Sequence, residues 1–317
     1  MAEDTLPTVR DVLTPAEWTA RAEAHRVRAD AFTAAHRDRA RRGESHPVWD
    51  FLFTYYNLQP RRLRVWHPGY GVTLSGEAAT AYLDRAGYVV VPGGATVGPA
   101  RLRARVPTLQ FIAALLRSTA ARPPVLGCFG MHEWAMVYRC DKPRHTGVPL
   151  RLGHAGTDRV VESMPLRCTH FNTFRFFTPA AAARSEIRPT RRTQTAWEQP
   201  GCLHAAMDLY KWAGKLIPLT DSDLLMDCLE LAAVARELDM RASPYDLSGY
   251  GFAPIAVEEP SGRAHYVREQ SAISERAGNL RSSLLRRCEQ LLVDAGGQTG
   301  NRARIGSEDF SREEPHV

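Results

Sequence analysis

Long stretches with a helical spacing of apolar residues restrict the fold of this chain more than any other feature. Apolar side chains recur every three or four positions over residues 108–121, 203–217, 221–240 and 262–295. This spacing places them on one face of an α-helix, and that face must pack against other elements. The sequence therefore predicts a fold dominated by helices.

The N-terminal part of the chain carries further helix signals. Thr14-Pro15-Ala16-Glu17 has the pattern of a capping box with proline in the first turn, and predicts a helix that runs to about Gly43. Residues 45–57 carry a proline at position 47 and then hold five aromatic residues, so we expect this segment to be buried or to line a pocket. Residues 77–86 and 126–138 also show helical patterns.

A different pattern appears in the middle of the chain. Residues 148–178 are rich in β-branched and aromatic residues and are interrupted by glycine and proline, which predicts a small antiparallel β element. Residues 88–91 are predicted to form a short strand, and residues 92–99 a loop. We therefore expect an α+β fold, predominantly helical, with a small antiparallel β element in the middle of the chain.

The division into domains follows from the same patterns. Residues 1–297 are expected to form a single compact domain with a β-rich insert at about 148–178. Residues 298–317 are polar, charged and poor in large aliphatic side chains. Such a segment buries too little surface to offset the entropy of ordering, so we expect a flexible tail.

The amino-acid composition indicates in which cellular compartment the protein is expected and which binding partners it can have. No stretch approaches the roughly 18 apolar residues of a membrane span, and the acidic start lacks the features of a secretory signal. We therefore expect a cytoplasmic protein without a membrane partner. The six cysteines form no Cys-x-x-Cys pair, and the net charge of +6 is compatible with a polyanionic partner without requiring one. The sequence carries no signal for an oligomeric state.

Three pairs of a histidine and a carboxylate stand out as candidate chemistry. His46 and Asp50 are four residues apart, as are His204 and Asp208, so on a helix each pair presents an imidazole and a carboxylate on one face. His132 and Glu133 are adjacent, and neighbouring helical residues point about 100° apart. Only one of these two is expected to face the others.

Glu133 lies among large apolar residues in this stretch. An apolar setting disfavours the charged form of a carboxyl group, which suits a proton carrier. The alternative is a structural ion pair with a buried arginine such as Arg139 or Arg175. Both interpretations remain open at this point.

Three segments resemble actinobacterial proteins commonly labelled 3-methyladenine DNA glycosylase. They are HPVWDFLFTYY at 46–56, GMHEWAMVYR at 130–139 and the run from EQPGCLHAAMDLYKWA to DMRASPYDL at 198–247. The resemblance covers nearly the whole chain apart from its last twenty residues. It implies a DNA repair enzyme that flips alkylated purine bases out of double-stranded DNA and hydrolyses the N-glycosidic bond without a cofactor.

The resemblance assigns no catalytic residue, so the roles follow from the chemistry of the side chains. A carboxylate, Glu133 or Asp208, can orient the water and stabilise positive charge on the sugar, with His132 and His204 as further catalytic candidates. Aromatic rings can stack on a flipped base, and cations can hold the phosphates. The substrate-binding candidates are Tyr55, Tyr56, Trp134, Arg139, Arg175, Tyr210, Lys211 and Trp212.

Two alternatives remain open. The first is a metal-dependent enzyme in which helices supply imidazole and carboxylate ligands to iron or manganese; these ligands are His46, Asp50, Glu133, His204 and Asp208. The second is a noncatalytic module that binds nucleic acid or protein, in which the same residues form buried polar networks.

Overall fold

The computed structural model describes residues 9–140 and 147–296. The predicted flexible tail at 298–317 therefore lies outside the described residues. The first half contains β1 (Asp11–Leu13), α1 (Pro15–Arg42), α2 (Phe51–Thr54), α3 (Pro60–Leu63), β2 (Val72–Ser75), the 3₁₀ helix η1 (Glu77–Tyr82), β3 (Tyr88–Val91), β4 (Gly94–Val97), α4 (Pro99–Arg103), α5 (Val106–Ala120) and α6 (Met131–Ala135). The second half contains α7 (Gly153–Ser163), α8 (Phe171–Phe174), α9 (Pro179–Arg184), η2 (Arg191–Thr193), α10 (Gln194–Trp197), α11 (Leu203–Leu216), α12 (Ser222–Arg241), η3 (Ser248–Tyr250) and α13 (Pro260–Asp294).

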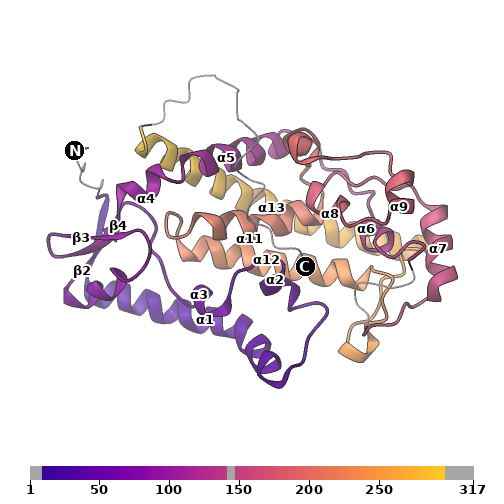
Figure 1. Ribbon diagram of the computed structural model, residues 1–317, viewed down its shortest axis with the longest axis horizontal. Helices are drawn as coiled ribbons and strands as arrows, with labels where there is room; N and C mark the ends of the chain where they lie inside the picture. Colours follow the sequence, from indigo (N-terminus) through magenta and orange to yellow (C-terminus); the bar gives the residue numbers. More distant parts are fainter. Residues whose placement is uncertain (1–8, 141–146, 297–317) are drawn as a thin grey trace.

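The elements are arranged around three long C-terminal helices. Helices α11, α12 and α13 pack against one another, and α5 packs against α13. Figure 1 shows the small sheet at one end of these helices and the short helices α6 to α9 at the other end. The fold is α+β and predominantly helical, as the sequence predicts.

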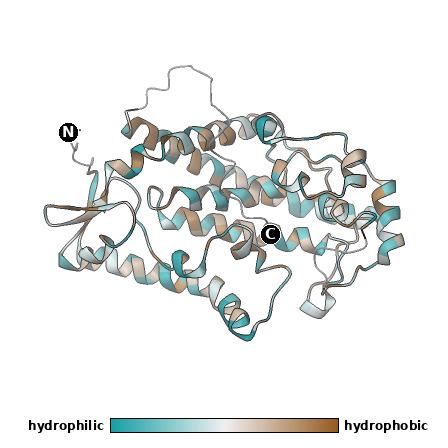
Figure 2. Ribbon diagram, viewed as in Figure 1, coloured by the Kyte–Doolittle hydropathy of each residue, from teal (hydrophilic) through white to brown (hydrophobic). Residues whose placement is uncertain are grey.

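Burial is most complete in α11 and α12. Figure 2 shows apolar and polar residues interleaved along the helices, as expected when each helix turns one face to the core. Nearly every side chain of α11 is buried, and so are most side chains of α12. Among residues 9–140 and 147–296, no helix has both the length and the apolar composition needed to cross a bilayer.

The predicted N-terminal helix is confirmed as α1. Thr14 accepts a hydrogen bond from the backbone N–H of Glu17, and the Glu17 side chain accepts one from the backbone of Thr14. Gly43 ends the helix with φ +69°, a left-handed conformation that glycine adopts at little cost. The boundaries therefore follow from local sequence alone.

The sheet lies in the N-terminal third of the chain, and its strand order is β1-β2-β4-β3. Strands β1 and β2 are parallel, whereas β2–β4 and β3–β4 are antiparallel. The predicted strand at 88–91 is confirmed as β3. The predicted loop at 92–99 is wrong, because β4 occupies half of it. Gly94 gives the reason: a Cβ there would lie 2.0 Å from the carbonyl oxygen of Leu74, so glycine lets the strands approach.

The predicted β-rich insert at 148–178 is also wrong. This segment forms α7 and α8, and the only β-type pairing within it, among the described residues, is an isolated bridge between Leu150 and Tyr245. The buried residues of α7 are Gly156, Thr157, Val160 and Val161. Their spacing is helical, so the β-branched side chains pack from one face of a helix. The β-branched and aromatic composition of this segment suggested strands, but its buried residues repeat at the three-to-four-residue spacing of a helix.

Candidate metal centre

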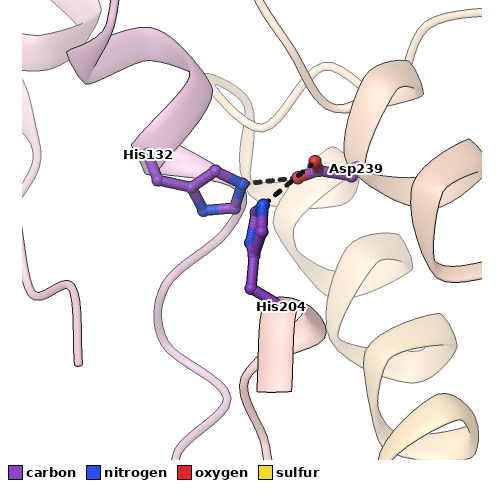
Figure 3. A group of neighbouring side chains, drawn as sticks. All are labelled: His132, His204 and Asp239. Atoms are coloured by element: carbon purple, nitrogen blue, oxygen red, sulfur yellow. Dashed lines mark hydrogen bonds and ion pairs between the residues drawn. The ribbon is translucent and has the colours of Figure 1, made fainter. Parts of the chain in front are cut away.

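Three buried side chains from three distant segments meet in the core. His132 comes from α6, His204 from α11 and Asp239 from α12. The Nε2 atom of His132 lies 2.6 Å from Oδ1 of Asp239, and Nε2 of His204 lies 3.9 Å from Oδ2 of the same residue. Figure 3 shows both imidazoles directed at the carboxylate.

Local structure places each of these groups. Gly130, with φ +70°, turns the chain into the short helix α6, and His132 follows in its first turn. His204 lies in the first turn of α11 and Asp239 near the end of α12. One ligand atom from each side chain lies within 4.8 Å of the other two. We refer to His132, His204 and Asp239 as the central triad.

An arginine holds the central triad from one side. Arg236, 1% exposed, lies one turn before Asp239 on α12. Its Nη1 atom donates to Oε1 of Glu133 at 2.9 Å and to Oδ2 of Asp239 at 3.1 Å. Its guanidinium also lies 4.2 Å from the ring centroid of Phe51 and donates to the carbonyl of Pro47. This arginine connects the aromatic N-terminal segment to the site, and it is the partner of Glu133 in place of Arg139 or Arg175.

The surroundings shift the pKa values of the two imidazoles of the triad in opposite directions. Burial disfavours the charged form of His132, but the adjacent Asp239 carboxylate outweighs this and raises the pKa of His132. Burial and the neighbouring His132 lower the pKa of His204. Burial opposes ionisation of Asp239, yet His132, His204 and Arg236 together lower its pKa. The directions of these pKa shifts favour an ionised Asp239, a protonated His132 and a neutral His204.

Asp208 lies one helical turn after His204 and faces a second group of polar residues. Its Oδ2 atom lies 3.3 Å from Nε2 of His170 and 3.7 Å from Nζ of Lys211. Burial opposes its ionisation, but Lys211 and His170 outweigh burial and lower the pKa of Asp208. Burial and the Asp208 carboxylate raise the pKa of Tyr56, so its phenol stays protonated beside this anion.

His46 and Asp50 form their hydrogen bonds outside the group of buried residues around the central triad. Asp50 accepts hydrogen bonds from Arg39, from His36 and from the backbone N–H of His46. The ring of His46 accepts from the backbone N–H groups of Val48 and Trp49. Both side chains therefore fasten residues 46–50 to one another and to α1. Of the ligands expected from spacing, the central triad contains His204 alone.

The predicted aromatic residues differ in what they can contact. Trp134 is fully buried and donates to the carbonyl of Ala242, which makes it a core residue. Trp212 is buried against Phe111 and lies under the ammonium of Lys211. Tyr56 is the aromatic candidate that lies near Asp208, and two further candidates pack on its ring. Tyr56 and Tyr210 meet edge to face at 5.4 Å, and Tyr55 packs on Tyr56 at 5.0 Å.

The two predicted arginines contact other groups. The guanidinium of Arg139 is exposed and pairs with Glu162, and that of Arg175 stacks over Phe176. Four buried residues around the predicted ones were not among the predicted site residues: Asp239, Arg236, His170 and Glu198, whose Oε2 atom lies 3.8 Å from Nε2 of His170. A usable signal did exist on α12, because Arg236 and Asp239 are charged residues one turn apart within an otherwise apolar stripe.

Comparisons with known proteins give no result. No family model, curated protein or solved structure matches this chain.

Proposed function

We propose that this protein is a metal-dependent enzyme that binds a first-row transition metal such as iron or manganese through His132, His204 and Asp239. The observation that supports this proposal is the convergence of three ligand atoms within 4.8 Å, on side chains that are all at least nine-tenths buried. Two imidazoles and one carboxylate suit iron, manganese or zinc, and three protein ligands leave coordination positions for water or substrate.

The surrounding side chains fit this role. Arg236 donates to Oδ2 of Asp239, which leaves Oδ1 directed at His132. Hydrogen bonds of this kind orient metal-binding carboxylates and tune their affinity. Binding of an ion requires His132 to lose a proton, because a metal ligand must be a neutral imidazole. We therefore expect metal uptake to release protons and to weaken as the pH falls.

Metal analysis of protein purified without a histidine tag tests the proposal. We expect about one equivalent of transition metal in the wild type and a loss of most of it in His204→Ala and Asp239→Asn, since each removes one of three ligands. His265→Ala is the matched control, because this histidine is exposed on α13. A metal-free wild type, or full metal content in both ligand variants, would refute the assignment.

A second candidate function is excision of alkylated purines from double-stranded DNA by an intracellular repair glycosylase. It rests on the family resemblance and on the surroundings of Asp208, a carboxylate with a lowered pKa beside the phenol of Tyr56, whose ring packs edge to face on that of Tyr210. A carboxylate of this kind can stabilise positive charge on the sugar, and electron-rich rings favour a cationic alkylated base. Because Asp208 is buried, a base reaches it only if the surrounding segments open.

Incubation with alkylated duplex DNA tests this second function. We expect release of 3-methyladenine or 7-methylguanine, a loss of release of about a hundredfold or more in Asp208→Asn, and no effect of a chelator. Release that is absent, or that persists in both Asp208→Asn and Glu133→Gln, contradicts it. A protein that neither binds metal nor releases bases would contradict both functions.

A further inference from the structure

A second set of metal-type ligands lies next to the central triad. The Nε2 atom of His170 lies 3.3 Å from Oδ2 of Asp208 and 3.8 Å from Oε2 of Glu198. All three side chains are at most 2% exposed. On the other side of the ring, Nδ1 of His170 lies 2.9 Å from the hydroxyl of Thr173, which fixes the ring so that Nε2 faces the carboxylates.

The two sets form one continuous cluster through His204. Its ring centroid lies 4.3 Å from that of His132 and 5.5 Å from that of His170. His204 and Asp208 are one turn apart on α11, so this helix supplies a ligand to each set. The His204 ring therefore lies between the histidine of one set and the histidine of the other.

The second set contains an unsatisfied acceptor. Oδ1 of Asp208 is buried and has no hydrogen-bond partner within the part of the chain that the structure describes. The nearest cation is the Lys211 ammonium, 3.7 Å from the other carboxylate oxygen, beyond the distance of a good hydrogen bond. A buried anionic oxygen without a partner is costly, and a bound cation is one way to satisfy it.

We propose that His170, Glu198 and Asp208 form a second metal position, so that the fully loaded protein holds two ions side by side. This inference rests on the proposed function, because the first ion occupies the central triad. The ligand atoms of the second set are more widely spaced than those of the central triad. An ion bound there has to draw Glu198 toward Asp208, and it has to displace the Lys211 ammonium. The second ion therefore binds after the first and more weakly.

Titration of metal-free, untagged, full-length protein with Mn²⁺ tests the proposal, with stoichiometry from metal analysis and the state of the ions from electron paramagnetic resonance. We expect two equivalents in the wild type and an exchange-coupled signal at saturation. Asp208→Asn and Glu198→Gln should stop at one equivalent with the signal of an isolated ion. Both substitutions keep the size of the side chain, and circular dichroism checks that the variants are folded.

Lys211→Met gives the most specific result. If Lys211 competes with the second ion, its removal improves metal binding, whereas removal of a cation with only a structural role would not. We expect its second equivalent to bind about tenfold more tightly than in the wild type. Lys215→Met, one turn further along α11, is the matched control and should leave both affinities unchanged.

The two proposals fail in different ways. A wild type that saturates at one equivalent, lost in His204→Ala and kept in Asp208→Asn, overturns the second position and leaves the first intact. Two equivalents retained in both Asp208→Asn and Glu198→Gln also overturn it. A wild type that binds no metal at all removes both positions.

Discussion

At the scale of single residues, burial and a neighbouring charge decide which protonation state a side chain adopts. His132 and His204 are equally inaccessible, yet the pKa of His132 is raised and that of His204 is lowered. The difference arises because His132 lies 2.6 Å from Asp239, whereas His204 lies 3.9 Å from it and next to the charged His132 ring. Similar side chains thereby acquire different capacities for accepting a proton or a metal.

His67, outside the cluster, provides a clean test of the same principle. Burial, with Arg85 and His25 nearby, lowers its pKa from 6.5 to about 3, and Nδ1 of the neutral ring faces the Tyr88 hydroxyl at 3.0 Å. Between these two pH values the unfolded chain binds a proton that the folded chain does not. The free energy of unfolding therefore falls as the pH falls below about 6.5.

We expect His67→Gln to lose about 1.4 kcal/mol less stability than the wild type between pH 7.5 and pH 5.5, because glutamine does not titrate and still accepts a hydrogen bond. Urea denaturation at the two pH values measures the difference. Equal losses in the two proteins would show that His67 is protonated in the folded state.

At the scale of elements, close backbone approach decides where helices can pack. Gly262 lies in the first turn of α13, and a Cβ at this position would lie 1.9 Å from the carbonyl oxygen of Ala256. The obstacle is backbone, so a side-chain rotation cannot relieve it. Gly278 lies in the same helix and would have no atom within 4 Å of an added Cβ.

These two glycines form a matched pair for mutation. We expect Gly262→Ala to destabilise the protein by about 2 kcal/mol or more, because the segment before α13 has to move. We expect Gly278→Ala to stabilise it by about 0.5–1 kcal/mol, since alanine favours the helix interior. Denaturant titration of both variants measures the effect, and a loss of stability in Gly278→Ala similar to that in Gly262→Ala would contradict this account.

At the scale of the whole molecule, the cluster exists only because distant segments are packed together. His132 and Asp239 are 107 residues apart, and Arg236 and Pro47 are 189 residues apart, yet each pair is in contact. Three helices and the aromatic segment at 46–56 therefore share one buried polar network. Breaking one member leaves other buried charges without partners, which couples the site to the stability of the core.

The sequence by itself determined those features that depend on neighbours along the chain. The capping box at Thr14, the left-handed cap at Gly43 and the apolar periods of α5, α11, α12 and α13 identify the main helices, because helical hydrogen bonds and caps are local. The sequence also pointed to His132, Glu133, His204 and Asp208, all of which lie in the buried cluster.

Only the tertiary structure decided which of these groups meet. The pair at His46 and Asp50 has the same spacing as His204 and Asp208, but it connects a loop to α1. Asp239 from α12 and His170 just before α8 instead complete the buried cluster. Equal spacing along a helix cannot show which face is buried or what lies opposite. That depends on contacts between residues far apart in sequence, where burial makes a charge costly and a partner necessary.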